Sequence, residues 1–212
     1  MDYLEINRRA FDATADEHKA KIGHYAQWTQ DVVARFGSHI DDRFAHPHIL
    51  ELGPGSGYAA KLLRERGYHV TAIEFSEKMA AVARETAPGI DIIVDEFLQH
   101  DFSATKYSGI YAVAFIHLFP NEDVRKVLAK INFLLDDQGV ACIATTLHQT
   151  AEEGYFAREH FSNQLVRYRR RFTKEELEQL LHAADFQVIG EYPQQDSEIE
   201  GLLWVNYMVE RE

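Results

Sequence analysis

Three glycines at alternate positions, Gly53, Gly55 and Gly57, separate an apolar run from a helix-like pattern in "HILELGPGSGYAAKLL". A turn without Cβ atoms bends sharply and lets a ligand approach main-chain N–H groups. The G-x-G-x-G spacing differs from the G-x-G-x-x-G of dinucleotide folds, and no Lys-Ser/Thr pair follows as in a phosphate-binding P-loop. The turn therefore indicates either a site for a cofactor without a phosphate, such as a sulfonium, or simply a tight connection.

Carboxylates accompany this turn at the ends of the expected strands. Glu74 closes the second strand, where a carboxylate can accept both hydroxyls of a ribose, and Glu51 precedes the first glycine, where it would suit a cationic ligand. Asp95, Glu96 and Phe97 follow the third strand and offer acceptors for an exocyclic amine and an aromatic wall for a purine. Each group also has an ordinary interpretation, as a strand-end acid or as a charged loop with one anchoring phenylalanine.

An alternation of strands and helices must bring these groups together. Strands are expected at 48–52, 69–74, 91–94, 109–119 and 140–146, with helices at 58–66, 76–84 and 121–135, the last two capped by Ser76 and Asn121. Such alternation implies parallel β-α-β units with right-handed crossovers. The last two strands, "FQVIGEY" and "LLWVNYMV", are expected to be antiparallel neighbours, one inserted beside the other. The predicted fold is α/β, a Rossmann-like doubly wound, mostly parallel seven-stranded sheet with an antiparallel last strand and N-terminal helices.

We expect one domain in three parts. Residues 1–45 have apolar residues at helical spacing and form a helical lid, 46–146 form the cofactor-binding core, and 147–212 supply substrate-side helices and the last two strands. A polar helix is expected at 151–164, and Thr173 with Glu176 predicts a capping box. In the lid, the side chains expected to matter, as lid contacts or as core, are Phe11, His18, Tyr25 and Trp28.

Composition excludes several classes of protein. The single cysteine, Cys142, rules out an internal disulfide and a cysteine-cluster metal site, so no metal is expected and a cytoplasmic location is the simplest expectation. No apolar run reaches the roughly 20 residues that span a bilayer, and the charged start does not resemble a secretory signal. The net charge of -12 makes nucleic acid an unlikely general partner, although a local basic patch could exist.

Five segments resemble, in order and spacing, the motifs of class I S-adenosylmethionine-dependent methyltransferases of the small-molecule type. They are "ILELGPGSGYAAKLL", "VTAIEFSEKMAAVAR", "VDEFLQHDF", "YSGIYAVAFIHLFP" and "LDDQGVACIAT". The resemblance is strong over 48–146 and extends more weakly through "RRFTKEELEQLLHAADFQVI" and "LLWVNYMV". Two departures are Glu51, where the family often has Asp, and Tyr107-Ser108, where it frequently has Phe-Asp. Neither removes a group on which cofactor binding depends.

The resemblance implies S-adenosylmethionine as cofactor, S-adenosylhomocysteine as product, and a role for each matching residue. Glu74 would hold the ribose, and Phe115 would lie near the methionine tail. The methionine part would be surrounded by Glu51, Gly53, Pro54, Gly55, Ser56 and Gly57. The adenine would be flanked by Phe75 and Met79, with Asp95, Glu96 and Phe97 at its edge.

The acceptor side has weaker signals. Methyl transfer by direct displacement needs alignment and exclusion of water, and it needs a base only if the acceptor loses a proton. His117, at the end of the expected fourth strand, could be that base or a hydrogen-bonded structural histidine. Further candidates are His148, Tyr155 and His160.

An arginine-rich segment, "LVRYRRRF", would place Arg167, Arg169 and Arg171 on one face of an extended chain. Guanidinium groups suit carboxylates or phosphates, so the acceptor could be anionic; the plainer alternative is a solvated edge whose charges prevent aggregation. The sequence therefore predicts a methyltransferase for a small molecule. A non-catalytic cofactor-binding scaffold or sensor stays open, and the glycine spacing disfavours an NAD-dependent oxidoreductase.

Overall fold

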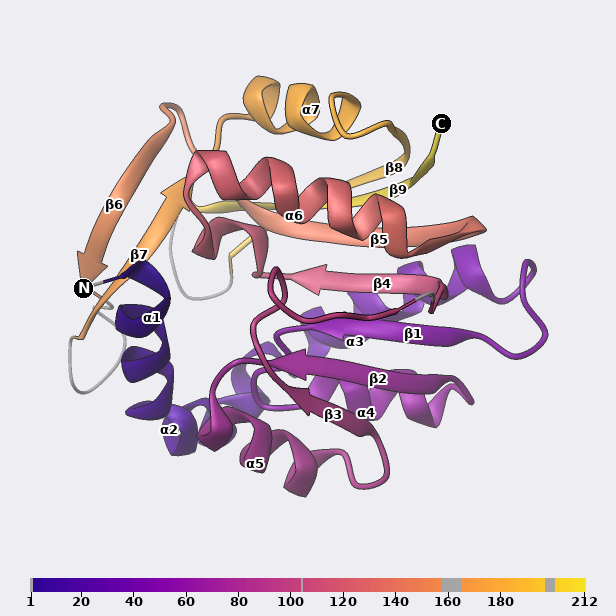
Figure 1. Cartoon of the computed structure of the whole chain (residues 1–212), viewed down its shortest axis with the longest axis horizontal. Helices are drawn as coiled ribbons and strands as arrows, with labels where there is room; N and C mark the ends of the chain where they lie inside the picture. The colour runs from indigo at the N-terminus through magenta and orange to yellow at the C-terminus, as the bar shows by residue number, and fades with distance from the viewer. Residues whose placement is uncertain (1, 104, 158–164, 197–200) are drawn as a thin grey trace.

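A seven-stranded sheet lies at the centre of the computed structural model, which describes residues 2–103, 105–157, 165–196 and 201–212 (Figure 1). Its strands are β1 (His48–Leu52), β2 (His69–Glu74), β3 (Asp91–Val94), β4 (Tyr107–Val113), β5 (Leu135–Leu147), β8 (Phe186–Gln195) and β9 (Leu203–Arg211). They lie in the order β3-β2-β1-β4-β5-β9-β8; the first five are parallel, and β9 is antiparallel to both neighbours. The predicted fold class is confirmed.

Helices cover both faces of this sheet. Helices α3 (Ile22–Ile40) and α4 (Tyr58–Glu65) pack on one face, α6 (Asn121–Leu134) and α7 (Lys174–His182) on the other, and α5 (Glu77–Thr86) lies beside β2 and β3. Alternate residues of each strand face opposite layers, so both faces are apolar. Ile49 of β1 packs with Phe36 of α3, whereas its neighbour Leu50 belongs to the core under α6 and α7.

Smaller elements gather at the carboxyl ends of the parallel strands. These elements are α1 (Tyr3–Asp12), α2 (Ala15–Ala20), the short 3-10 helix η1 (Ile116–Leu118) and a two-stranded sheet of β6 (Glu152–Ala157) and β7 (Val166–Arg171). Figure 1 shows α1, β6 and β7 at the end of the molecule toward which the arrow of β4 points. Within the described residues, no helix combines the length and the apolar content needed to cross a bilayer.

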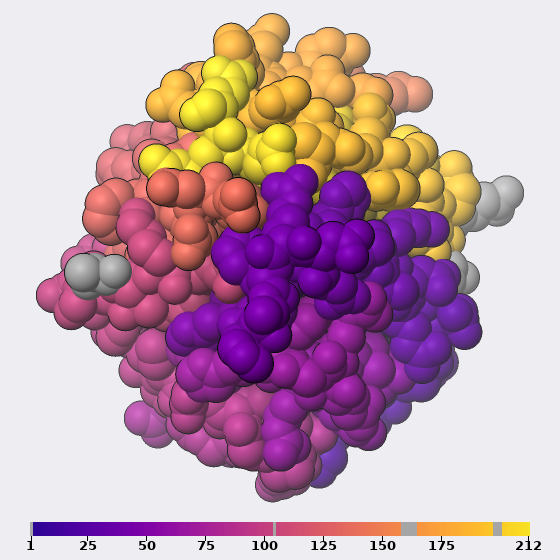
Figure 2. Space-filling model, turned by 90° about the vertical axis from the view of Figure 1, so that its right-hand side faces the viewer, coloured from indigo at the N-terminus to yellow at the C-terminus, as the bar shows by residue number. Residues whose placement is uncertain are grey.

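The opposite end of the molecule is closed by contacts between the early and late parts of the chain. Figure 2 shows this face, where purple residues before β1 lie beside yellow residues of the C-terminal strands. Arg43, in the segment between α3 and β1, donates to Glu210 of β9 at 2.8 Å and to the Gln138 carbonyl at 3.2 Å. The N-terminal segment is therefore attached to the sheet at both ends of the strands.

Three elements differ from the sequence-based prediction by five residues or more. Strand β5, expected at 140–146, begins at Leu135. The strand expected at 109–119 ends at Val113, because Ala114 adopts a positive φ of 56° and the chain turns into η1. The helix expected at 151–164 is wrong over 152–157, which form β6, and 158–164 lie outside the described residues. Strand β6 exists because it pairs with β7 over six residues of each strand, an arrangement that no local pattern predicts.

The predicted helix caps have mixed outcomes. Ser76 accepts from the Met79 N–H at 3.1 Å and Thr173 from the Glu176 N–H at 3.2 Å, so both are confirmed. Helix α6 has Pro120 at its N-cap, so the prediction of Asn121 is wrong. The Glu176 side chain accepts from Arg170, so it is engaged away from the predicted capping box.

Candidate functional site

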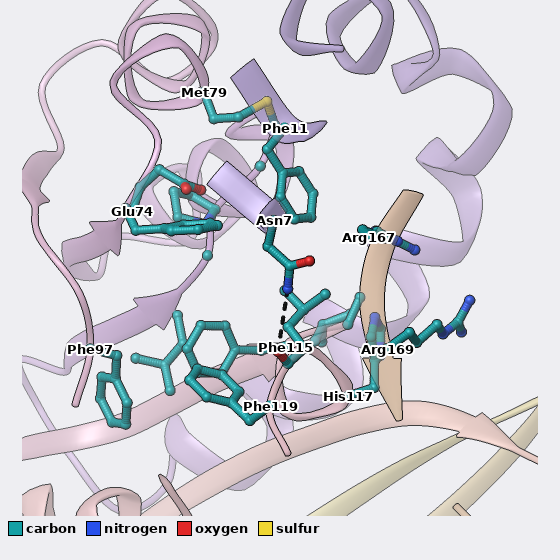
Figure 3. Close-up of a pocket in the computed structure, with 18 of the residues that line it drawn as sticks. Asn7, Phe11, Glu74, Met79, Phe97, Phe115, His117, Phe119, Arg167 and Arg169 are labelled. Carbon is teal, nitrogen blue, oxygen red and sulfur yellow. Dashed lines mark hydrogen bonds between the residues drawn. The ribbon is translucent and has the colours of Figure 1, made fainter. Parts of the chain in front are cut away.

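A cavity of about 1310 Å³ lies at the carboxyl ends of the parallel strands. Its walls come from the β1–α4 turn, the residues after β2, β3 and β4, the N-terminal helices, β7 and the start of β9. Sites for one small ligand usually occupy roughly 300–1,000 Å³, so this cavity has room for two molecules side by side. Figure 3 shows Glu74 and Phe97 on one side of the pocket and Arg167 and Arg169 on the other.

The glycine turn lines this cavity through Gly53, Pro54, Gly55 and Ser56. All three glycines have positive φ angles, 66°, 56° and 79° in order. A Cβ on Gly55 would have only Met79 Cε, at 3.8 Å, and the Gly53 carbonyl oxygen, at 4.0 Å, as neighbours, so this position is open. A Cβ on Gly57 would lie 2.8 Å from the Ala83 backbone, which means that Gly57 allows α4 and α5 to pack and does not line the cavity.

Two buried carboxylates flank the turn. Glu51, at 3% exposure, has Oε2 buried without a hydrogen-bond partner among the described residues. Burial, together with the charge of Glu74, raises its pKa to about 8. Glu74, at 5% exposure, accepts from the Ser76 N–H at 3.0 Å, and burial raises its pKa to about 7 although backbone N–H groups lower it. Both line the cavity, so this wall becomes negative, and can pair with a cation, when these carboxyls ionise near neutral pH.

Aromatic and sulfur-containing side chains form the rest of this wall. Met79 is fully buried, Phe97 is nearly so, and Phe97 packs edge-on against Phe115 with ring centroids 5.7 Å apart. Phe75 also lines the cavity, and its ring packs against that of Phe11 in α1 with the ring centroids 5.9 Å apart. These flat and polarizable surfaces suit a purine ring.

The two acids after β3 are engaged with neighbouring groups. Asp95 pairs with His100 Nδ1 at 2.9 Å, and this hydrogen bond lowers the pKa of Asp95. Glu96 accepts from Arg8 of α1 at 2.9 Å. Both line the cavity, and the Arg8 contact shows that α1 closes over the strand ends.

The N-terminal helices contribute four of the residues singled out in the sequence to the cavity wall. Phe11, His18, Tyr25 and Trp28 all line the cavity. The sequence analysis missed Asn7, a buried residue of α1 that donates to the Leu118 carbonyl at 3.3 Å and accepts from the Tyr168 N–H at 2.7 Å. One polar residue within a helix carries no sequence signal for such a role; only the meeting of α1, η1 and β7 reveals it.

The candidate bases are in different places. His117, in η1, is 2% exposed, lines the cavity and has Nδ1 3.2 Å from the Thr145 hydroxyl oxygen. His148 is not among the lining residues; burial, followed by the charges of Arg169 and Arg171, lowers its pKa to about 4. Tyr155 is half exposed and also outside the lining, and His160 lies outside the described residues.

Strand β7 turns one arginine face toward the cavity. Arg167, Arg169 and Arg171 line it, whereas Arg170 points the other way and pairs with Glu153 at 2.6 Å and with Glu176. The alternation expected from "LVRYRRRF" is therefore present, and the face that it directs inward is the basic one. The three arginines therefore face the cavity, and the side chain of Arg171 is also 39% exposed to solvent.

The family of the chain follows from a comparison of sequences. A family model described as a methyltransferase domain matches residues 21–191, which is most of the chain. The chain belongs to this methyltransferase family. The assignment confirms the family resemblance that the glycine turn and the four following motifs predicted.

A relative agrees with this assignment, and two solved structures have a similar fold. This methyltransferase domain is 26% identical over 170 residues to an uncharacterized methyltransferase of Staphylococcus carnosus, covering 79% of this chain and 75% of that one. Its fold is similar to that of 1,6-didemethyltoxoflavin-N1-methyltransferase of Burkholderia thailandensis, solved with 1,6-didemethyltoxoflavin and S-adenosylhomocysteine (TM-score 0.73, 19% identity, 99% and 88% of the two chains). It is also similar to magnesium protoporphyrin IX methyltransferase of Synechocystis PCC 6803 with bound S-adenosylmethionine (TM-score 0.71, 16% identity, 99% and 98%).

Proposed function

We propose that this chain transfers a methyl group from S-adenosylmethionine to a small-molecule acceptor. The observation that carries the proposal is the buried Glu51 carboxylate, whose Oε2 lacks a partner beside an open glycine turn. A buried acceptor atom without a donor is costly, so a ligand that brings N–H groups and positive charge fits here. The amino group and sulfonium of S-adenosylmethionine have both properties, and the two methyltransferases of similar fold were solved with this cofactor or its product.

Different residues of the cofactor wall would bind the methionine, ribose and adenine parts of the cofactor. Glu51, with the main chain from Gly53 to Gly57, would hold the methionine part, the last glycine acting through helix packing. Glu74 would accept from the ribose hydroxyls. The adenine would lie between Phe75, Met79 and Phe97, with Asp95 and Glu96 at its edge and Phe115 toward the methionine.

When bound, S-adenosylmethionine supplies a methyl group on a positively charged sulfur, which keeps the bonding electrons as the acceptor atom forms the new bond to carbon. The chain contributes alignment and exclusion of water, and the N-terminal helices over the cavity suit both tasks. If the acceptor atom carries a proton, His117 would remove it, because its ring lines the cavity and the Thr145 hydroxyl orients Nδ1.

Calorimetry with S-adenosylhomocysteine and NAD tests the cofactor. We expect the former to bind and NAD to give no comparable signal. Glu51→Gln should weaken binding by roughly 10- to 150-fold, the range for a hydrogen bond to a charged group, whereas Glu65→Gln on the surface of α4 should leave it unchanged. Binding of NAD alone would refute the proposal, and binding without turnover of any acceptor would favour a scaffold or sensor.

A further inference from the structure

The arginines of strand β7 differ in whether a carboxylate compensates their positive charge, and this difference points to the acceptor. Arg170 is 6% exposed and has two carboxylate partners on the side away from the cavity. Arg171 faces the cavity but pairs with Glu152 at 2.8 Å and lies over the Phe156 ring at 4.3 Å. Both positive charges are therefore compensated within the protein.

Arg169 has no such compensation. Its Nη2 donates to the Thr146 hydroxyl at 2.8 Å, its Nε is buried without a partner, and no described carboxylate lies within ion-pair distance of it. Asp196 is the acidic residue that acts on it from farther away, and Asp196 accepts from Trp204 Nε1 at 2.7 Å. A guanidinium keeps its charge in proteins, so Arg169 places an unneutralised cation in the cavity wall.

The neighbours of Arg169 hold it in place and leave space beside it. Across β6, the residue paired with Arg169 is Gly154, which has no side chain to cover the guanidinium. The Thr146 hydroxyl that accepts from Arg169 lies 3.0 Å from His148 Nε2, and the low pKa of His148 keeps this ring neutral and able to accept the Thr146 proton. His148 is therefore a positioning residue for Arg169, acting through Thr146.

Glu74 and the guanidinium groups of Arg167 and Arg169 lie on opposite sides of the pocket in Figure 3. The lining also includes Lys130, beside Phe97, and Asp196, whose charge acts on Arg169. Aromatic rings of the cavity lining lie close to the β7 arginines: Arg167 lies over the Phe11 ring at 5.6 Å, and Arg171 over the Phe156 ring at 4.3 Å. A molecule that fits beside these arginines has a flat apolar body and a negatively charged group.

We propose that Arg169 binds an oxyanion of the methyl acceptor, so that the acceptor is a small aromatic molecule bearing a carboxylate or a phosphate. The proposal rests on the proposed function and deepens it. A guanidinium edge can donate two parallel hydrogen bonds to either oxyanion, which fixes orientation as well as charge.

The test uses binding to the protein saturated with S-adenosylhomocysteine. The probes are benzoate, its neutral isostere benzamide, and inorganic phosphate, all at constant ionic strength. The readouts are the melting temperature and the fluorescence of the two tryptophans, Trp28 and Trp204, which both line the cavity. We expect benzoate or phosphate to stabilise the complex and change the fluorescence, and benzamide to do so at least tenfold more weakly. The responding oxyanion identifies the charged group.

Variants of β7 provide matched controls. Arg169→Gln should abolish the oxyanion response, Arg169→Lys should keep part of it, and Arg171→Gln should keep most of it. Without probes, Arg169→Gln should melt at or above the wild-type temperature because it removes an uncompensated charge. Arg170→Gln should melt roughly ten degrees lower because it leaves two carboxylates unpaired.

Three results would overturn the inference: no response of the wild-type complex to either oxyanion, a wild-type response in Arg169→Gln, or a loss of stability in Arg169→Gln equal to that in Arg170→Gln. The last result would make Arg169 structural. Failure of S-adenosylhomocysteine to bind would instead refute the proposed function, so the two failures are distinguishable.

Discussion

The Tyr25 hydroxyl donates to Ser56 Oγ at 2.9 Å, which joins helix α3 to the glycine turn. Both residues line the cavity. This bond links α3, which contributes to the cavity wall, to the turn that would hold the methionine of the cofactor, so we expect it to slow cofactor exchange.

Tyr25→Phe removes this link and keeps the ring. The hydroxyl also lies 3.3 Å from the His18 carbonyl oxygen in α2, away from the turn. The loss of the Ser56 hydrogen bond, about 0.5–1.5 kcal/mol, should speed dissociation of S-adenosylhomocysteine by roughly 2- to 13-fold. Stopped-flow fluorescence measures the rate. Tyr192→Phe, which loses a hydroxyl contact to His39 outside the cavity, is the control and should dissociate at the wild-type rate. Equal rates in all three proteins would remove the lid role of α3.

Cofactor binding should release protons near neutral pH. Burial raises the pKa of Glu51 from 4.5 to about 8 and that of Glu74 to about 7, and a cationic ligand favours their ionised forms. Affinity for S-adenosylmethionine should therefore rise with pH between about 6 and 8, by up to about tenfold per unit for each proton released. Calorimetry in buffers of different ionisation enthalpy counts these protons. A flat pH profile would contradict the raised values.

The raised pKa values of Glu51 and Glu74 should make the ligand-free protein less stable as pH rises, whereas they make cofactor affinity higher. A carboxyl whose pKa is higher in the folded state binds more protons when folded, so its contribution is complete below 4.5 and is lost as pH rises through about 7 to 8. Urea unfolding at several pH values should show this loss in the wild type and less of it in Glu51→Gln. The raised pKa values would be contradicted if the free energy of unfolding increased as pH rose through about 7 to 8, and if Glu51→Gln showed the same increase.

Alanine substitutions at Gly57 and Gly55 should have different effects, the first on stability and the second on cofactor affinity. Gly57→Ala places a Cβ 2.8 Å from the Ala83 backbone at a positive φ, so it should destabilise the fold by several kcal/mol. Gly55→Ala has space and carries only the strain of its positive φ, roughly 1–2 kcal/mol, so it should fold and lose cofactor affinity. Urea unfolding and calorimetry separate the two effects. Wild-type affinity in a folded Gly55→Ala protein would mean that the turn is only a connector.

His117→Asn tests the proposed base once an acceptor has been found. If the acceptor atom loses a proton, kcat should fall by about 10²- to 10⁴-fold and the limb of the pH profile near neutrality should disappear, with cofactor affinity unchanged. His148→Asn is the comparison, because His148 does not line the cavity; its effect should be on the acceptor KM, through Arg169, and not on that limb. A small effect of His117→Asn on kcat would leave His117 with a structural role beside Thr145.

Local patterns were sufficient for the first half of the sheet. Strands β1, β2 and β3 begin and end where the sequence predicts, because short apolar runs bounded by turn residues and the Ser76 cap are signals within a few neighbouring residues. The carboxylates at their ends could be placed at one edge for the same reason, since parallel strands bring their carboxyl ends together.

Tertiary contacts decided the acceptor side. Residues 152–157 have a composition compatible with a helix, yet they form a strand because β7 offers both backbone partners and the arginines that pair with Glu152 and Glu153. Alternation in "LVRYRRRF" predicted a basic face, but it could not say which face turns inward. In the structure, the Asn7 side chain accepts from the Tyr168 N–H and donates to the Leu118 carbonyl, and these two hydrogen bonds attach β7 to α1 and η1. Pairings between segments more than a hundred residues apart depend on the packed fold, and no local pattern contains them.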